Sequence, residues 1–296
     1  MTILDDASDP TAATIAARKL TSEHHVDVLV DPSITPTSLA ALQVAGDTET
    51  PIITLAGSNA IVLPVDGPRR WAFEIPPSEE VALKVVFDRM KKAGRKSLAI
   101  VAVANAYGQS FLDVAQTLKI VASRPDVVLI AAAGTPAAMP QIELKNRGYA
   151  GTIFQTQAVA NNDDLRIGGT ALNGTLLPVS PLPVAEQLPS DNQVKAVASS
   201  YVARYEAIHG AASRSLFGGM AWDAYLLLDR AVPAALKTAQ PGTPAFRKAL
   251  RDAFEKTTNL VLTQGVYTVK ASDHNGADAR SQVLVVIDNG TWKFVE

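Results

Sequence analysis

The 296-residue sequence contains no cysteine. This absence excludes disulfides, thiol nucleophiles and thiolate metal sites, and it leaves the redox compartment undecided. Charged residues are also few, at 19%, and the net charge of −2 provides no basic surface, so we expect no nucleic-acid partner. No apolar run approaches the roughly 18–20 residues that span a bilayer.

The N-terminus lacks a targeting signal as written. Residues 1–10 have no basic start, no apolar stretch and no small-residue cleavage site. A mature or shortened chain would look the same. The hydrophobic content of 47% is normal for a globular protein, and the length suffices for two lobes with a core each.

Catalytic signatures are missing too. There is no GxGxxG after a strand, no Walker A loop, no GxSxG elbow and no HExxH. None of the four histidines has a second histidine or a carboxylate at a spacing suited to a metal, and we interpret them as solvated surface residues: His24, His25, His209 and His274. We therefore expect no catalytic residue, no metal and no cofactor.

What the sequence does contain is an alternation of short aliphatic runs with amphipathic stretches, which is typical of βαβ units around a parallel sheet. The expected strands and C-terminal aliphatic runs are 3–4, 26–30, 51–55, 98–104, 127–132, 152–155, 265–269, 282–288 and 292–295. The expected helices are one beginning at Pro10, then 37–45, 78–92, 109–123, 137–147, 193–209, 217–236 and 246–256. The first helix carries Ile15 and Leu20 on one face.

Two connections have informative composition. Residues 176–189 contain four prolines, and we interpret this long irregular stretch as a crossing between lobes. Asp288-Asn-Gly290 stands between the last two aliphatic runs and predicts a β-hairpin.

Small polar turns follow four of the expected strands, at residues 33–35, 57–59, 105–107 and 155–157. Ligands of open α/β sheets bind at the carboxyl ends of the strands. Hydroxyls and backbone N–H groups at helix starts would suit a carboxylate. The alternative, that Ser33 and Ser58 only cap the helices that follow them, stays open.

At these turns the chain resembles the type I periplasmic binding proteins, the branched-chain amino acid (leucine/isoleucine/valine) receptor family of ABC importers. Each match is short, but the set follows the family's order over nearly the whole chain. The matching stretches are Asp5-Asp-Ala-Ser-Asp-Pro10, Pro32-Ser-Ile-Thr-Pro36, Ala104-Asn-Ala-Tyr-Gly-Gln109, Pro125-Asp126, Gly148-Tyr149, Ala221-Trp-Asp-Ala224 and Asp273-His-Asn-Gly276.

The resemblance implies a clamshell of two Rossmann-like α/β lobes with parallel sheets, joined by three crossings and closing over a small ligand. Lobe I would comprise residues 1–76 and 184–280, and lobe II residues 77–183 and 281–296. The expected ligand-binding residues are Ser33, Thr35, Ala56, Gly57 and Ser58 from lobe I, Tyr107, Thr135 and Gln157 from lobe II, and Trp222 as a wall of the cleft. Core packing is the alternative for Trp222 and for Phe217.

The function implied is that of a monomeric periplasmic solute-binding protein, which binds an amino acid or a keto or aromatic acid in the interlobe cleft and delivers it to ABC permease subunits. It would make or break no covalent bond. Three alternatives remain: a ligand-sensing or regulatory module of the same fold, an α/β enzyme with an unrecognised site, and a truncated receptor that binds nothing.

Two departures from the family pattern matter. Gln157 matches a position where relatives typically have an acidic residue against the ligand ammonium, so its uncharged amide favours an acid without an amino group. In addition, the family's first strand and helix, and an edge strand of lobe II, have no counterpart here. We expect a short strand at residues 2–4 to slide inward, or lobe I to be weakened, and a melting temperature below that of full-length relatives.

Overall fold

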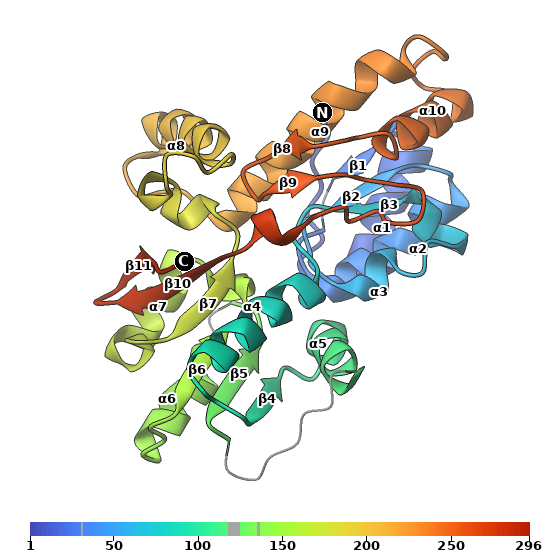
Figure 1. Ribbon diagram of the computed structural model, residues 1–296. Helices are drawn as coiled ribbons and strands as arrows, with labels where there is room; N and C mark the ends of the chain where they lie inside the picture. The colour runs from blue at the N-terminus through green and yellow to red at the C-terminus, as the bar shows by residue number, and fades with distance from the viewer. Residues whose placement is uncertain (31, 118–124, 135–136) are drawn as a thin grey trace. The chain divides into compact units, whose positions relative to one another are not determined.

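The computed structural model describes residues 1–30, 32–117, 125–134 and 137–296, which fold into two compact units (Figure 1). Unit 1 comprises Met1–Ser78 and Phe217–Asp278, and unit 2 comprises Glu79–Leu216 and Ala279–Glu296. Residues 184–216 were expected in lobe I, whereas in the structure they belong to unit 2. Gln187 holds them there, because its side chain donates to the carbonyl oxygen of Trp292 and accepts from the amide of Phe294.

The sheet of unit 1 consists of three short parallel strands in the order β1-β2-β3. They are β1 (Leu29–Val30), β2 (Ile52–Thr54) and β3 (Ala72–Glu74). Ile52 and Ile53 are fully buried, as expected for a central strand covered on both faces. Strand β3 was not predicted, because Glu74 interrupts its only apolar run. The expected α/β fold with parallel strands is nevertheless confirmed.

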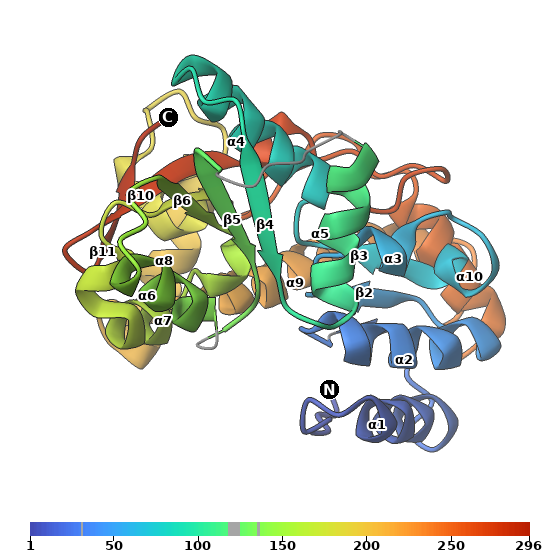
Figure 2. The same cartoon turned by 90° about the horizontal axis from the view of Figure 1, so that it is seen from below.

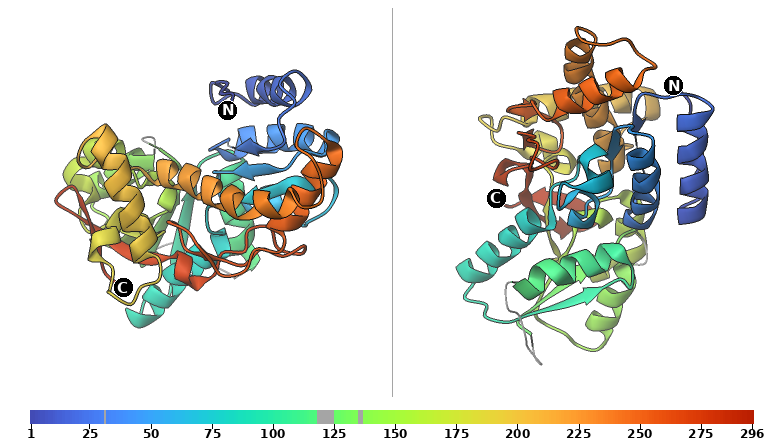
Figure 3. Two further views of the ribbon diagram at one scale, coloured as in Figure 1. Left: turned by 90° about the horizontal axis from the view of Figure 1, so that it is seen from above. Right: turned by 90° about the vertical axis from the view of Figure 1, so that its right-hand side faces the viewer.

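The helices of unit 1 cover this sheet. They are α1 (Pro10–Ser22), α2 (Thr35–Asp47), α3 (Asn59–Val62), η1 (Gly67–Trp71), α9 (Leu216–Ala235) and α10 (Pro244–Phe254). Helix α1 lies beside α2 (Figures 2 and 3). It buries Ala13 and Ala17, whereas Ile15 is 62% exposed, so the packed face of the helix is formed by small side chains and not by Ile15.

The start of unit 1 also differs from expectation. Residues 1–6 form no strand, and the side chain of Ile3 is 78% exposed. The expected inward slide of residues 2–4 therefore does not occur. Among the described residues β1 pairs with β2 alone, and a cavity of about 150 Å³ beside it is lined by residues that include Leu4, Ala13 and Leu29.

A buried carboxylate anchors α9 to the hairpin of β8 (Leu260–Val261) and β9 (Val266–Tyr267). Asp223 accepts hydrogen bonds from the amides of Thr263 and Gln264, at 2.8 and 3.0 Å, and from the Thr263 hydroxyl. Burial raises the pKa of Asp223 to about 7, although these three donors oppose the shift. The three hydrogen bonds therefore offset only part of the cost of burying the carboxylate, while they tie α9 to the hairpin.

Unit 2 contains a six-stranded sheet in the order β11-β10-β7-β6-β5-β4, in which β4 to β7 are parallel and β10 and β11 are antiparallel. Its strands are β4 (Leu98–Ala102), β5 (Val127–Ala131), β6 (Thr152–Gln155), β7 (Leu176–Val179), β10 (Val283–Asp288) and β11 (Thr291–Phe294). Residues 176–189 were expected to be irregular, but they begin with β7, in which Pro178 is tolerated within a four-residue strand.

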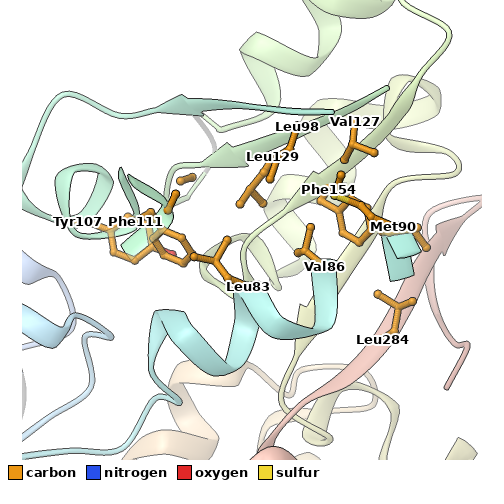
Figure 4. Close-up of a cluster of buried hydrophobic side chains, with 13 residues drawn as sticks. Leu83, Val86, Met90, Leu98, Tyr107, Phe111, Val127, Leu129, Phe154 and Leu284 are labelled. Carbon is orange, nitrogen blue, oxygen red and sulfur yellow. The ribbon is translucent and has the colours of Figure 1, made fainter. Parts of the chain in front are cut away.

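The helices of unit 2 are α4 (Glu79–Lys92), α5 (Ala106–Thr117), α6 (Ala138–Asn146), α7 (Asn162–Gly168) and α8 (Lys195–His209). Short 3₁₀ segments are η3 (Gln157–Val159), η4 (Gly169–Leu172), η5 (Leu182–Gln187) and η6 (Ala279–Ser281). A continuous apolar cluster joins α4 and α5 to the sheet (Figure 4), with Leu83 and Val86 of α4 against Leu129 and Phe154. This cluster is the core on that side of the sheet.

The predicted hairpin at residues 288–290 is confirmed between β10 and β11. Asn289 and Gly290 both have positive φ, of 49° and 73°, as a two-residue type I′ turn requires. Within the described ranges, no helix combines the length and the hydropathy needed to cross a membrane.

Candidate ligand-binding site

The loops after β1 and β2 bring together five of the predicted site residues in unit 1. Because the two strands are parallel neighbours, their carboxyl ends meet at one edge of the sheet, and the amide of Leu55 bonds to the carbonyl of Pro32 across the loops at 3.1 Å. The predicted residues at this edge are Ser33, Thr35, Ala56, Gly57 and Ser58.

The hydroxyl groups of this edge do not serve as helix caps. Ile34, not Ser33, is the N-cap of α2, and Ser58 is the N-cap of α3 without a side-chain capping bond. The hydroxyls of Thr35 and Ser58 are buried and have no hydrogen-bond partner among the described residues. Buried hydroxyls normally find a partner, so these two are candidates to meet a ligand.

Helix α2 adds a favourable field for an anion at the same edge. It begins at Thr35, directly after the β1 loop, and runs for 13 residues. The N-terminus of such a helix carries a partial positive charge and backbone N–H groups without helical acceptors. Together with the Thr35 hydroxyl, these groups can bind a carboxylate.

A buried acidic residue, not predicted as part of the site, fixes the β2 loop. The carboxylate of Glu74 accepts the Ser58 amide at 2.5 Å on Oε1 and the Asn275 side-chain amide at 2.8 Å on Oε2. Asn275 also donates to the carbonyl of Pro76. The Ser58 amide is therefore already engaged, and a ligand anion would depend on the α2 side of the site.

His274 belongs to the same support, and the interpretation of this histidine as a solvated surface residue was wrong. Its side chain is buried, with Nδ1 2.8 Å from the Ala72 carbonyl and Nε2 3.3 Å from a carboxylate oxygen of Glu255. The ring stacks on Phe73 at 4.3 Å. The match of Asp273-His-Asn-Gly276 to the family was the available signal for His274 and Asn275.

Trp222 and Phe217 both lie on α9 and are half-buried. The Trp222 ring is 5.4 Å from the ring of Tyr225, which is exposed. Neither residue is fully enclosed in the core. The role of Trp222 as a wall of the site stays a prediction.

In unit 2 the predicted residues have different environments. Tyr107 is buried, packs edge-on against Phe111, and donates its hydroxyl to Thr156 Oγ1 at 2.8 Å; burial raises its pKa well above the usual range. Gln157 is half-buried and accepts a bond from Gln282 at 3.3 Å. Thr135 lies outside the described residues. Tyr107 thus contributes to the core, whereas Gln157 presents a partly accessible amide.

No group of three or more histidine, aspartate or glutamate side chains in the described part of the chain is arranged to hold a metal ion. What the site offers is hydroxyls, amides and a helix N-terminus at the carboxyl edge of a parallel sheet. Such an arrangement is typical of the ligand-binding edge of open α/β sheets.

Comparisons with known proteins agree with this interpretation. Residues 1–117 match a family model described as periplasmic binding protein. An extracellular ligand-binding receptor from Rhodopseudomonas palustris HaA2 is 34% identical with a TM-score of 0.94, and the match covers 100% of this chain and 89% of that one. The Rp1789 protein of R. palustris strain CGA009 is also 34% identical, with a TM-score of 0.93 and coverage of 99% and 88%.

A leucine-binding protein from Thermotoga maritima shares the fold at 21% identity, with a TM-score of 0.76 over 99% of this chain and 85% of that one. A search of curated proteins produced no match. The chain belongs to the type I periplasmic binding proteins, which include leucine/isoleucine/valine-binding proteins. This is a family of ligand-binding receptors, not of enzymes.

Proposed function

We propose that the chain is the solute-binding component of an ABC importer, which binds a small carboxylate-bearing ligand and delivers it to permease subunits. The observation that carries this proposal is the pair of buried hydroxyls, on Thr35 and Ser58, without partners among the described residues. Both lie at the carboxyl edge of the unit 1 sheet, where the N-terminus of α2 favours an anion.

The ligand class follows from the charges around this edge. The backbone N–H groups at the α2 N-terminus and the Thr35 hydroxyl can donate hydrogen bonds to one carboxylate. Glu74 is occupied by Ser58 and Asn275, and Gln157, which only the family resemblance assigns to the ligand, is uncharged, so neither supplies a committed partner for an ammonium group. We therefore favour a keto or aromatic acid over a free amino acid, because a buried ammonium without a counter-ion is costly.

The cellular setting is proposed on the same basis. The similar proteins from R. palustris are described as extracellular ligand-binding receptors, which supports a periplasmic location for this chain. A receptor in that compartment acts by handing its ligand to membrane subunits. We propose that it does so as a monomer.

A thermal-shift screen tests this proposal. We expect 4-methyl-2-oxopentanoate or benzoate to raise the melting temperature, because a ligand that binds the native state stabilises it. Leucine and valine should have smaller effects. Thr35→Val, which removes the hydroxyl but keeps the shape, should abolish most of the shift.

Thr14→Val is the matched control, since Thr14 is a threonine of α1 whose hydroxyl bonds only its own helix. It should leave the shift unchanged. Large shifts with leucine or valine and none with the acids would reject the preference for an acid. No shift with any of the four compounds would contradict the proposed binding site.

A further inference from the structure

Unit 2 contains a cavity of about 340 Å³ that none of the predicted site residues lines. Its walls come from the start of α7, from η5, from the segment before α9 and from the hairpin of β10 and β11. A volume of this order lies within the range of small-molecule sites. We propose that this cavity is a second binding site, specific for a small uncharged aromatic molecule that carries an amide or hydroxyl group.

The apolar side of the cavity suits a ring. Leu182 and Leu216 are almost completely buried, and Leu165 and Pro183 stand beside them. The indole of Trp292, on β11, is half-buried and lines the same space. Aromatic pairs are stabilised beyond the burial of their area, so a planar ligand would gain from packing against this indole.

The charged groups near the cavity compensate one another. Arg214 donates through Nε to Glu206 at 2.6 Å and through Nη1 to Glu186 at 2.7 Å. Lys195 bonds the carbonyl of Leu188 at 2.6 Å and lies close enough to lower the pKa of Glu186, although the hydrogen bond from Arg214 is the main cause. Two positive charges therefore balance two negative ones.

Asp164, in the first turn of α7, is buried, and burial raises its pKa to about 6, but it is not one of the residues that line the cavity. The charged side chains that do line the cavity, Arg214 and Glu186, are paired with each other, so neither is an unpaired counter-ion for an ionic ligand. A carboxylate or an ammonium group would lose its hydration on entering this cavity and would find no contact that offsets the loss. An uncharged ligand is therefore favoured.

Two adjacent asparagines provide the specific polar contacts. Asn161 uses Oδ1 to accept the Asp164 amide at 2.8 Å, and its Nδ2 has no acceptor among the described residues. Asn162 donates through Nδ2 to the Ala212 carbonyl at 3.0 Å, and its Oδ1 has no described donor. One donor and one acceptor at neighbouring positions complement a primary amide, which offers the reverse pair.

Benzamide is the probe for this site. The sequence contains three tryptophans, and only Trp292 lies in unit 2, because Trp71 and Trp222 belong to unit 1. In the double variant Trp71→Phe/Trp222→Phe, the emission of Trp292 alone is followed as benzamide is added. We expect a saturable change, with benzoate and benzylamine binding at least about tenfold more weakly.

Asn162→Ala should weaken benzamide binding by about tenfold because it removes the acceptor. Asn146→Ala, an exposed asparagine on α6, is the matched control and should change nothing. Ser58→Ala, in the proposed ligand site of unit 1, should also leave the Trp292 response intact, which separates the two proposals. Circular dichroism verifies that each variant is folded.

Three results would overturn the second site: no saturable response of Trp292 up to the solubility limit of benzamide, equal binding of the charged analogues, or an Asn162→Ala variant that binds like the parent. Loss of the Trp292 response in Ser58→Ala would likewise contradict it, because the ligand would then occupy the unit 1 site.

Discussion

The two units stabilise their sheets differently. The parallel sheet of unit 1 has three strands of two or three residues, whereas the sheet of unit 2 has six strands of four to six residues among the described residues. The large sheet of unit 2 is joined to α4 and α5 by a continuous apolar cluster. Unit 1 supplements its smaller sheet with buried polar side chains: Glu74 and His274 each bond two separate segments, and Asp223 bonds the turn of the β8–β9 hairpin.

This difference teaches that a small parallel sheet can be fixed by side-chain hydrogen bonds where strand length is insufficient. Such bonds are directional, so they also define the loops at the sheet edge, including the one that carries Ser58. Unit 1 should accordingly be the more sensitive to polar substitutions. The tryptophans report on the units separately, since Trp71 and Trp222 lie in unit 1 and Trp292 in unit 2.

The largest expected effect comes from Phe73→Ala in unit 1. Phe73 is fully buried, stacks on His274 and packs edge-on against Phe254 at 4.9 Å. Its loss should reduce the free energy of unfolding by roughly 3–5 kcal/mol. Denaturant titration of single-tryptophan variants should show the loss in the Trp71 signal. Leu129→Ala is the control in unit 2 and should act on Trp292; identical effects of both variants on both signals would contradict separate stabilisation of the units.

The second-largest loss of stability is expected for Asp223→Ala. It leaves two buried amides and the Thr263 hydroxyl without their acceptor, which we expect to cost roughly 2–3 kcal/mol. Hydrogen exchange should show faster opening of the β8–β9 hairpin. Asp229→Ala, an exposed aspartate on the same helix, serves as the control. Equal stability of the two variants would mean that the anchor contributes nothing.

In unit 2, substitution of the buried Asp164 should raise the free energy of unfolding, whereas the two substitutions above lower it. Its folded-state pKa of about 6 exceeds the unfolded value, so the native protein binds the proton more tightly and loses stability as the pH rises from about 4 to 6. Asp164→Asn should therefore gain roughly 1–3 kcal/mol at pH 7 and nothing below pH 4. Thermal denaturation between pH 4 and 7 measures this gain in stability. Asp163→Asn, at the exposed neighbouring aspartate, is the control. A gain that does not depend on pH would contradict the assignment.

The smallest effect is expected at the hairpin of β10 and β11. A Cβ at Gly290 would meet no neighbour, but the φ of 73° disfavours alanine, so Gly290→Ala should cost about 1 kcal/mol. Gly290→Asn should cost less, because asparagine tolerates this backbone region. Chemical denaturation followed by Trp292 measures both. If both substitutions lowered the free energy of unfolding equally, the cause would be steric and not the positive φ of this residue.

Strands β4, β5 and β10 of unit 2 were predictable because they are nearly uninterrupted aliphatic runs, whereas Pro178 disguised β7 as part of an irregular stretch. Strand β3 was not predictable, since its three residues include Glu74, whose burial depends on Asn275 some 200 positions later in the chain. The expected strand at residues 3–4 has the right composition but lacks a partner strand. Composition alone does not reveal pairing.

The candidate site, like the fold, could be predicted from the sequence only in part. Parallel topology brings the loops after β1 and β2 to one edge, so the proximity of Ser33, Thr35, Gly57 and Ser58 could be predicted from their position. Ala56 came from the family resemblance, and the ligand-binding role of these residues stays a prediction. Their supports, Glu74 and His274, were missed because acidic and histidine side chains are ordinarily exposed. Tyr107 was taken from the family resemblance, yet its environment is decided by Phe111 and Thr156, which no local pattern indicates.

The most direct test of the account is calorimetric titration with 4-methyl-2-oxopentanoate and benzoate. It compares the parent protein with the Thr35→Val and Ser58→Ala variants. If the buried hydroxyls at the carboxyl edge of unit 1 hold a carboxylate, one of these acids should bind the parent, and each substitution should weaken binding by about tenfold. Unchanged affinity in both variants, or no heat of binding for either acid with the parent, would contradict it.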